Sequence, residues 1–249
     1  MMHILGVDTS GQSCSAAVID EKSMLAEVNF DRPESHSKHL MEIIKMALGL
    51  AKIEISGVNG FAVTRGPGTF TGLRIGISSV KGFAAACARP VVGVSSLEAI
   101  AMQSASINGL VCPMIDARRG EVYTSVYRAE DRGLIKEKEE AVLPPDKAVA
   151  NINEPCIFVG SGACLYEKII LKRMGNLAEF AWPGHNVIRG STVARMGLKR
   201  IKDSDFDDVS AFVPYYIRKS DAELNRSKGR DEGVEILNAG FDEIEVINE

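Results

Sequence analysis

Two turns of this 249-residue chain contain an aspartate whose carboxylate could take part in catalysis or metal binding. Residues 8–11 (DTSG) and 116–121 (DARRGE) each follow a short apolar run. Paired carboxylates at strand ends can hold a magnesium ion, and glycines in such turns let backbone N–H groups approach phosphates. The second turn differs, because Arg118 and Arg119 stand where close backbone approach favours glycine. We therefore expect both aspartates to have a structural role in their turns. The alternative is an ATPase, in which Asp8 and Asp116 would together hold the magnesium ion.

A glycine-rich loop over residues 65–72 (RGPGTFTG) lies between an apolar run and a helical pattern. Helix N-termini attract anions, so this position is compatible with phosphate binding. The loop has no lysine after its last glycine and does not match the GxxxxGK[ST] pattern. We expect a tight turn that docks the following helix onto a sheet.

His36 and His39 are three residues apart at a helix start, a spacing that could chelate a metal ion. No third ligand is nearby in the sequence, and Lys38 between them would repel a cation. No Ser-His-Asp or Cys-His set can be assembled from the spacing. The sequence thus predicts no catalytic residue, no metal ligand and no cofactor-binding residue.

Alternating strand and helix patterns predict the elements that position the first turn. Strands are expected at 4–7, 14–19, 24–30, 61–64 and 91–94, and helices at 36–51, 72–88 and 96–104. Ser35 is the expected N-cap of the first helix. This order predicts a mixed sheet with helices packed on it.

The pattern restarts at residue 111. Strands are expected at 111–115, 121–128 and 156–159, a loop or strand at 130–140, and a short helix starting at 144–146. The repeat lies in element order and in the paired aspartates. Two such copies are typical of the actin-like ATPase (ribonuclease H-like) fold. We predict an α/β protein with two tandem actin-like subdomains, residues 1–105 and 106–220, and an acidic tail over 221–249.

The helices at 36–51 and 72–88 carry more apolar surface than one sheet face can cover. In the first, the polar positions form one narrow stripe, whereas a surface helix normally has an apolar stripe about 100° wide. The second has small residues that permit close approach. We predict a partner interface centred on Leu40, Ile43, Ile44, Leu73, Ile77 and Val80. A helix pair packed within its own chain is the alternative.

Composition and charge narrow the class of protein. The net charge of −4 argues against a protein that grips nucleic acid mainly by its own charge. Five cysteines without CxxC spacing are expected to be free thiols. No uncharged apolar run reaches about 18 residues, and the first residues show no signal-peptide pattern. We therefore expect a cytoplasmic protein with no membrane contact.

Residues 64–76 (TRGPGTFTGLRIG), continuing to Gly82, resemble the most distinctive segment of the TsaB family. Residues 4–10, 116–123 and 214–218 resemble further family segments in the expected order. The TsaB family is similar to the catalytic subunit TsaD, once classed with the M22 peptidases, which carries a metal-binding H-x-x-x-H pair. At the corresponding positions this chain has Ser96 and Ile100. The resemblance therefore implies a scaffold without catalytic chemistry.

The resemblance also implies partners. A family member is the non-catalytic scaffold or dimerisation subunit of the complex that installs threonylcarbamoyladenosine in tRNA. It binds a TsaD-like catalytic subunit through its N-terminal helices, together with a TsaE-like ATPase, and meets tRNA only through the complex. In isolation we expect a homodimer. The alternatives are a stand-alone actin-like small ATPase or kinase and an M22-like peptidase, and a nucleotide titration separates them.

Overall fold

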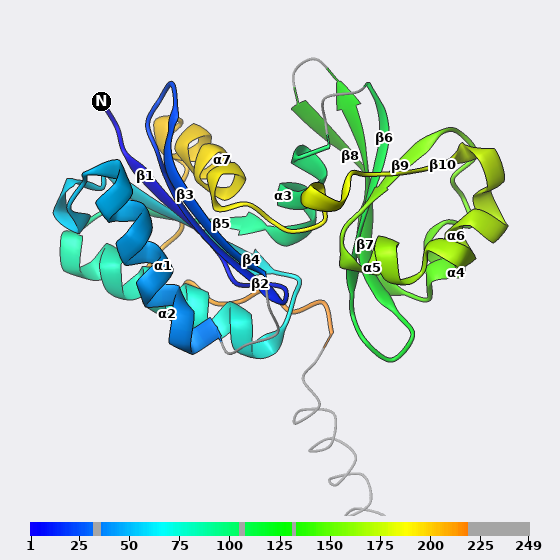
Figure 1. Ribbon diagram of the computed structural model, residues 1–249, viewed down its shortest axis with the longest axis horizontal. Helices are drawn as coiled ribbons and strands as arrows, with labels where there is room; N and C mark the ends of the chain where they lie inside the picture. The colour runs from blue at the N-terminus through cyan, green and yellow to red at the C-terminus, as the bar shows by residue number, and fades with distance from the viewer. Residues whose placement is uncertain (32–35, 105–107, 131–132, 219–249) are drawn as a thin grey trace, which may run out of the picture. The chain divides into compact units, whose positions relative to one another are not determined.

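A computed structural model describes residues 1–31, 36–104, 108–130 and 133–218, and residues 1–217 are built on two mixed β-sheets (Figure 1). The expected N-cap Ser35 and the expected acidic tail over 221–249 lie outside the described residues.

The first sheet contains the five strands expected from the N-terminal pattern. They are β1 (Ile4–Asp8), β2 (Ser13–Ile19), β3 (Met24–Asp31), β4 (Gly60–Gly66) and β5 (Val91–Ser95), in the order β3-β2-β1-β4-β5. β1 pairs antiparallel with β2, Leu5 opposite Val18, and parallel with β4, Leu5 opposite Phe61. Every residue of β1 is buried because helices cover both faces of this sheet.

Three helices cover the two faces of the first sheet. α1 (His36–Ala51) and α2 (Phe70–Cys87) lie on one face, and α7 (Gly190–Lys202) lies on the other (Figure 1). A short 3₁₀ turn, η1 (Ile55–Gly57), leads into β4. The ends of α1 agree with the expected helix because its apolar residues recur at the helical period.

The second sheet repeats the strand order of the first. Its strands are β6 (Gly109–Asp116), β7 (Val122–Glu130), β8 (Gly133–Leu143), β9 (Cys156–Val159) and β10 (Ala178–Phe180), in the order β10-β9-β6-β7-β8. The helical elements on this side are α4 (Pro145–Ala148), α5 (Ser161–Leu165), α6 (Glu167–Met174), η2 (Gly175–Leu177) and η3 (Pro183–His185). β1 and β6 are both central strands that end in an aspartate, as the internal repeat predicts.

Helix α3 (Ser96–Met102) joins the cores of the two sheets. Ser95 caps it, because the Ser95 hydroxyl accepts a hydrogen bond from the Glu98 N–H. Leu97 and Ile100 belong to an apolar cluster that includes Val94 of the first sheet and Val111 of the second. The helix is therefore packed on both sides.

The observed elements differ from the expected boundaries at the end of the second subdomain. Residues 106–220 were expected to fold together, but α7 packs on β1 and β4 of the first sheet. Its apolar face, which includes Val193, Ala194 and Leu198, is buried there. The predicted boundary of the second subdomain therefore needs correction. A helix packs where its apolar stripe is buried, and the face of the first sheet opposite α1 and α2 is free to bury that of α7.

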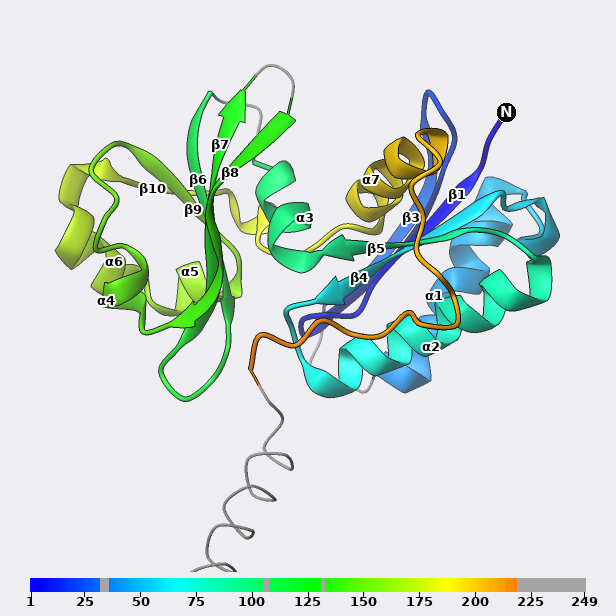
Figure 2. The same ribbon diagram turned by 180° about the vertical axis from the view of Figure 1, so that it is seen from behind.

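Residues 203–217, here called the strap, follow α7 and have neither helix nor strand. In Figure 2 the strap passes the edge of the first sheet beside β5 and then runs along α2. Asp207 pairs with Val91 in an isolated β-bridge, which covers the edge of β5. The strap therefore belongs to the N-terminal half as well.

Candidate functional site

The two aspartate turns line one cavity of about 480 Å³ between the two sheets. Its polar lining includes Asp8, Asp31, Asp116 and Arg118. Its apolar wall is formed by Ile100, Ile115, Leu165, Pro183, Val187 and Ile188. The sequence placed both turns at strand ends, and the structure brings them to the same cavity.

Asp8 is a buried carboxylate held by local donors. Its side chain accepts hydrogen bonds from the Ser10 N–H (3.1 Å), the Ser10 hydroxyl (2.7 Å) and the Thr64 hydroxyl (2.7 Å). The residue is only 1% exposed. Its contacts fix the β1–β2 turn and tie it to β4, which is the structural role that the sequence favoured.

The second turn has the backbone that glycine favours but the side chains of arginine. Arg118 and Arg119 have φ of 58° and 56°, in the left-handed region, and Gly120 follows with 78°. The Arg118 N–H donates to the Asp116 carboxylate at 2.8 Å, and the Glu121 N–H donates to the Arg118 carbonyl at 3.1 Å. A phosphate would therefore meet long side chains beside this backbone, as the sequence suggested.

The glycine-rich loop packs directly on the first aspartate turn. The Thr69 N–H donates to the Ser10 carbonyl at 2.7 Å, and the Thr9 hydroxyl donates to the Gly72 carbonyl at 2.7 Å. A Cβ at Gly72 would lie 2.0 Å from the Thr9 carbonyl oxygen, and one at Gly68 would lie 2.4 Å from that of Ser10. The glycines are needed for this close approach, so the loop docks α2 onto the sheet.

The thiols near the cavity are not activated as nucleophiles. Burial, and then the charge of Asp8, raises the pKa of the Cys14 thiol to about 12. Burial, and then Glu167, raises the pKa of Cys164, which lines the cavity. A nucleophilic cysteine requires a lowered pKa. All five cysteines are free thiols, as expected.

The positions that correspond to the TsaD histidine pair lie inside the core. Ser96 is fully buried, and Ile100 is 2% exposed. The Ser96 hydroxyl has no hydrogen-bond partner among the described residues. No group of three or more His, Cys, Asp or Glu residues within the described ranges could hold a metal ion. The side chain of His36 lies outside the described part of the chain, and the ring of His39 is tilted against that of Phe30, with centroids 4.5 Å apart.

The six predicted interface side chains require a correction. All of them are buried against the chain's own first sheet, with exposed fractions between 0 and 4%. They are Leu40, Ile43, Ile44, Leu73, Ile77 and Val80. The prediction located the two helices but chose the faces that the sheet covers, so a partner cannot contact these residues in this conformation.

The outer face of the same helix pair carries exposed apolar side chains beside the exposed Glu42 and Lys45, and the predicted centre of the interface did not include them. Met41, Met46 and Leu50 of α1 are 51%, 55% and 66% exposed. On α2, Gly82 is exposed, and a Cβ there would have no described heavy atom within 4 Å. The sequence indicated this surface by the width of the apolar part of α1, because one face of a sheet cannot cover all of it and leaves these two methionines and this leucine exposed.

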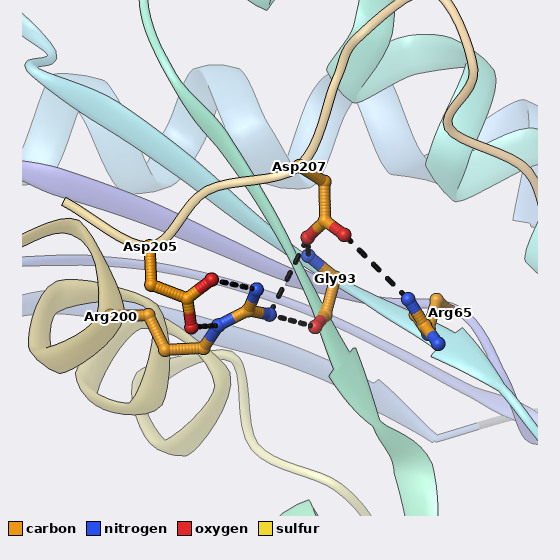
Figure 3. A network of polar contacts seen from close by, with 5 residues as sticks. All are labelled: Arg65, Gly93, Arg200, Asp205 and Asp207. Atoms are coloured by element: carbon orange, nitrogen blue, oxygen red, sulfur yellow. Dashed lines mark hydrogen bonds and ion pairs between the residues drawn. The ribbon is translucent and has the colours of Figure 1, made fainter.

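The strap is held by a polar network that sequence reasoning missed (Figure 3). The Asp207 carboxylate accepts from the Gly93 N–H at 2.8 Å and lies 3.6 Å from the Arg65 guanidinium. Arg200 of α7 donates to the Gly93 carbonyl at 2.9 Å and pairs with Asp205 at 2.7 Å. The partners in these contacts are far apart in the sequence, so no local sequence pattern predicts the contacts.

Two of the segments that resemble the TsaB family meet at the end of the strap. The Tyr215 N–H donates to the Arg65 carbonyl at 2.7 Å. The rings of Phe70 and Tyr216 stack with centroids 4.1 Å apart, and the Arg74 Nε donates to the Tyr216 hydroxyl at 3.1 Å. Residues 64–76 and 214–218 therefore contact each other in the fold, which explains why the two segments occur together.

Comparison with known proteins places the chain among related sequences. A family model described as "TsaD: tRNA N6-adenosine threonylcarbamoyltransferase" matches residues 31–226. The tRNA threonylcarbamoyladenosine biosynthesis protein TsaB of Bacillus subtilis (strain 168) is 30% identical over 226 residues, which cover 89% of this chain and 96% of that protein. The protein of the same name from Escherichia coli (strain K12) is 33% identical over 65% of this chain and 72% of its own length.

A solved structure supports the same relationship. It is described as an uncharacterized protein from Pseudomonas aeruginosa with similarity to the peptidase YEAZ. It is 29% identical, with a TM-score of 0.75 over 88% of this chain and all of that one. Together with the repeated sheets, this match confirms the expected α/β fold with two actin-like subdomains. None of the helices in the described part of the chain is long and apolar enough to cross a membrane.

Proposed function

Because the chain belongs to the TsaB family, we propose that it acts in the biosynthesis of threonylcarbamoyladenosine in tRNA. Its role in this proposal is that of a non-catalytic, cytoplasmic scaffold. It binds and organises a TsaD-like catalytic subunit together with a TsaE-like ATPase, and it meets tRNA only through that complex.

The observation that carries the scaffold role is the set of exposed apolar and small residues on the outer face of α1 and α2. We define this outer face by Met41, Met46 and Leu50 of α1 and by Ser78, Gly82 and Ala86 of α2, all of them exposed. Flexible methionines adapt to a partner surface, and small residues allow another helix to approach closely. Two helices of a partner could pack here as a four-helix contact.

The surroundings of the cavity favour the non-catalytic form of this proposal. Long side chains at Arg118 and Arg119 occupy a backbone that glycine favours, and the Cys14 thiol has a raised pKa. Ser96 and Ile100 are buried at the positions of the metal-binding pair that the resemblance identifies. The chain retains the scaffold of the fold without an evident catalytic set among its described residues.

A charge on the outer face tests the partner surface. In Met46→Glu, a carboxylate would be buried without a counter-ion when the partner binds, which costs several kcal/mol. We expect binding to the cognate TsaD-type subunit, measured by calorimetry, to weaken by roughly 100-fold or more, with unchanged thermal stability. Ile169→Glu is the matched control, because Ile169 is a similarly apolar side chain on α6, 42% exposed.

The possible results distinguish an error in the proposed partner surface from an error in the proposed function. If Met46→Glu binds as the native chain does, the outer face is not the interface, although the role in tRNA modification stands. If a cell that lacks its own TsaB still lacks threonylcarbamoyladenosine when supplied with this chain and its cognate partners, the proposed function is wrong. In the absence of the partner, we expect the same face to join two copies about a two-fold axis, so Met46→Glu should also make the chain monomeric.

A stand-alone ATPase, kinase or M22-like peptidase is the second candidate. The cavity lined by Asp8 and Asp116 is the observation in favour of the first two. Magnesium and ATP are titrated into the isolated chain, and ATP hydrolysis is then assayed. This experiment decides between the scaffold and the ATPase. Hydrolysis that disappears in Asp8→Ala would replace the scaffold proposal with the ATPase.

A further inference from the structure

The chain passes between the two sheets at two connections. The first runs from the end of α3 to β6 and includes Gln103 and Ser104, and the second, residues 181–189, runs from β10 to α7. Residues 105–107 of the first connection lie outside the described residues. Any movement of one sheet against the other must bend both connections.

The side chain of Gln103 joins the two connections. Its Nε2 donates to the carbonyl oxygens of Val187 at 2.9 Å and His185 at 3.2 Å, and its Oε1 accepts from the Arg189 N–H at 2.8 Å. A glutamine amide offers two donor hydrogens and one acceptor oxygen, so this geometry uses both of its ends. One side chain thus satisfies three backbone groups of the second connection.

The end of the second connection is fastened to the first sheet as well. The Ser191 N–H donates to the Glu27 carboxylate at 2.9 Å, and Arg189 forms an ion pair with the same carboxylate. The Gly190 N–H donates to the Ser15 hydroxyl at 2.7 Å. The Glu27 side chain is only 3% exposed, whereas the Arg189 side chain is 45% exposed, so the carboxylate end of this attachment is the part shielded from water.

The geometry points to Gln103 as a latch that fastens the two connections into one stiff hinge, and we propose that it keeps the width of the cavity between the sheets constant. α3 begins this arrangement, because it packs on both sheets before Gln103 reaches across. The latch holds the two sheets of residues 1–217 at one separation, whether or not the cavity is occupied. This role goes beyond the proposed scaffold function and does not depend on it.

Gln103→Met tests the latch because methionine has nearly the same length and makes none of these hydrogen bonds. Amide exchange followed by NMR reads the second connection residue by residue. We expect the Arg189 amide to exchange about tenfold faster, since it loses its acceptor. The latch also requires faster exchange at Gly190 and Ser191, whose own acceptors are intact.

A distance between the two sheets is the second measurement. Spin labels at Ser23→Cys and Glu139→Cys, in a background with Cys87→Ala and Cys164→Ser, report the spread of that distance. We expect Gln103→Met to broaden the distance distribution. Gln12→Met is the control, because Gln12 is the other glutamine of the chain and lies on the β1–β2 turn instead of a connection.

A purely local role of Gln103 gives a different result. If the Arg189 amide alone exchanges faster and the distance distribution stays as narrow as in the native chain, Gln103 is a cap and the latch is wrong. Gln103→Glu covers the case in which Gln103→Met does not fold. This variant keeps an acceptor for the Arg189 N–H but loses both donors. Faster amide exchange at Gly190 and Ser191, together with a broader distance distribution, supports the latch. Native exchange rates and a native distance distribution overturn it.

Discussion

At the residue scale, the glycines of α2 have opposite surroundings on one helix. A Cβ at Gly72 would lie 2.0 Å from the Thr9 carbonyl oxygen, whereas a Cβ at Gly82 would meet no described heavy atom within 4 Å. Glycine in a helix interior is about 1 kcal/mol less favourable than alanine. The packing of the β1–β2 turn explains Gly72. Gly82 has no such reason within the described chain, and the close approach of a partner helix would supply one.

We predict opposite signs for alanine at these two positions. Gly82→Ala should raise the free energy of unfolding by about 0.5–1 kcal/mol, because it removes backbone entropy without a clash. Gly72→Ala should lower it by about 3 kcal/mol, because a backbone oxygen stands where the methyl group must go. Urea denaturation of both variants measures the difference. An equal effect at both positions would mean that the β1–β2 turn can move away from α2.

Glu27 predicts how stability responds to acid. Burial tends to raise the pKa of Glu27, but hydrogen bonds from Ser191 and the pairing with Arg189 outweigh it, so the pKa lies below its ordinary value. A lowered folded-state pKa means that the carboxylate stabilises the fold fully above the unfolded pKa of about 4.3. That contribution is lost as the pH falls through the folded-state value.

Glu27→Gln should therefore destabilise the chain by about 1–3 kcal/mol near pH 7, because a charged acceptor is replaced. The difference from the native chain should shrink as the pH falls below about 4. Urea denaturation between pH 7 and pH 3 measures both effects. A difference that stays constant over this range would show that the charge of Glu27 contributes nothing to stability.

At the scale of the element, α2 has an inner and an outer face on neighbouring residues. Ile77 is 3% exposed and packs with Phe61 and Val63 in the core of the first sheet, whereas Ser78 is exposed. The strap adds contacts along the same helix, since the Lys81 ammonium donates to the Phe212 carbonyl at 3.0 Å. The helix is thus fixed on its inner face and at its side, and its outer face stays uncovered.

We predict that Ile77→Glu destabilises the fold by more than about 3 kcal/mol, since a carboxylate would be buried without a partner. Ser78→Glu should change the free energy of unfolding by less than about 0.5 kcal/mol. Thermal and urea unfolding of the two single variants provide the comparison. If Ile77→Glu stays as stable as Ser78→Glu, this face of α2 is not core.

At the scale of the whole molecule, the sequence predicted what is locally encoded. The apolar period of α1 predicted its ends, and the two aspartates at matching strand ends predicted the internal repeat. The period of α1 could not show which part of its wide apolar arc the sheet covers, so Leu40 was assigned to a partner. The path of the strap depends on single contacts such as that of Asp207 with Gly93, 114 residues away. Such contacts leave no periodic signal.

The return of α7 to the first sheet shows the same limit. Val193, Ala194 and Leu198 form a clear apolar stripe, but the stripe fits any sheet with an open face. The choice between the two sheets depends on backbone contacts that only the folded chain creates. A Cβ at Gly6 would lie 2.2 Å from the Gly190 carbonyl oxygen, and one at Gly197 would lie 2.4 Å from the Ala62 Cβ. These pairs of small residues let α7 sit closely on β1 and β4.

The strap leads to a prediction for the whole chain, tested by two truncations. A chain that ends at Ser220 keeps the strap and removes only residues 221–249, the acidic tail that the sequence predicts, so its free energy of unfolding should match the native value within about 0.5 kcal/mol. A chain that ends at Asp208 loses Phe212, which is 5% exposed and whose ring lies 2.5 Å from a Cβ placed at Gly93. It also loses the stacking of Tyr216 on Phe70. The loss of the buried aromatic ring alone costs about 3–5 kcal/mol, so the shorter chain should unfold at a clearly lower urea concentration. Equal stability of the two truncated chains would show that the strap only rests on the surface.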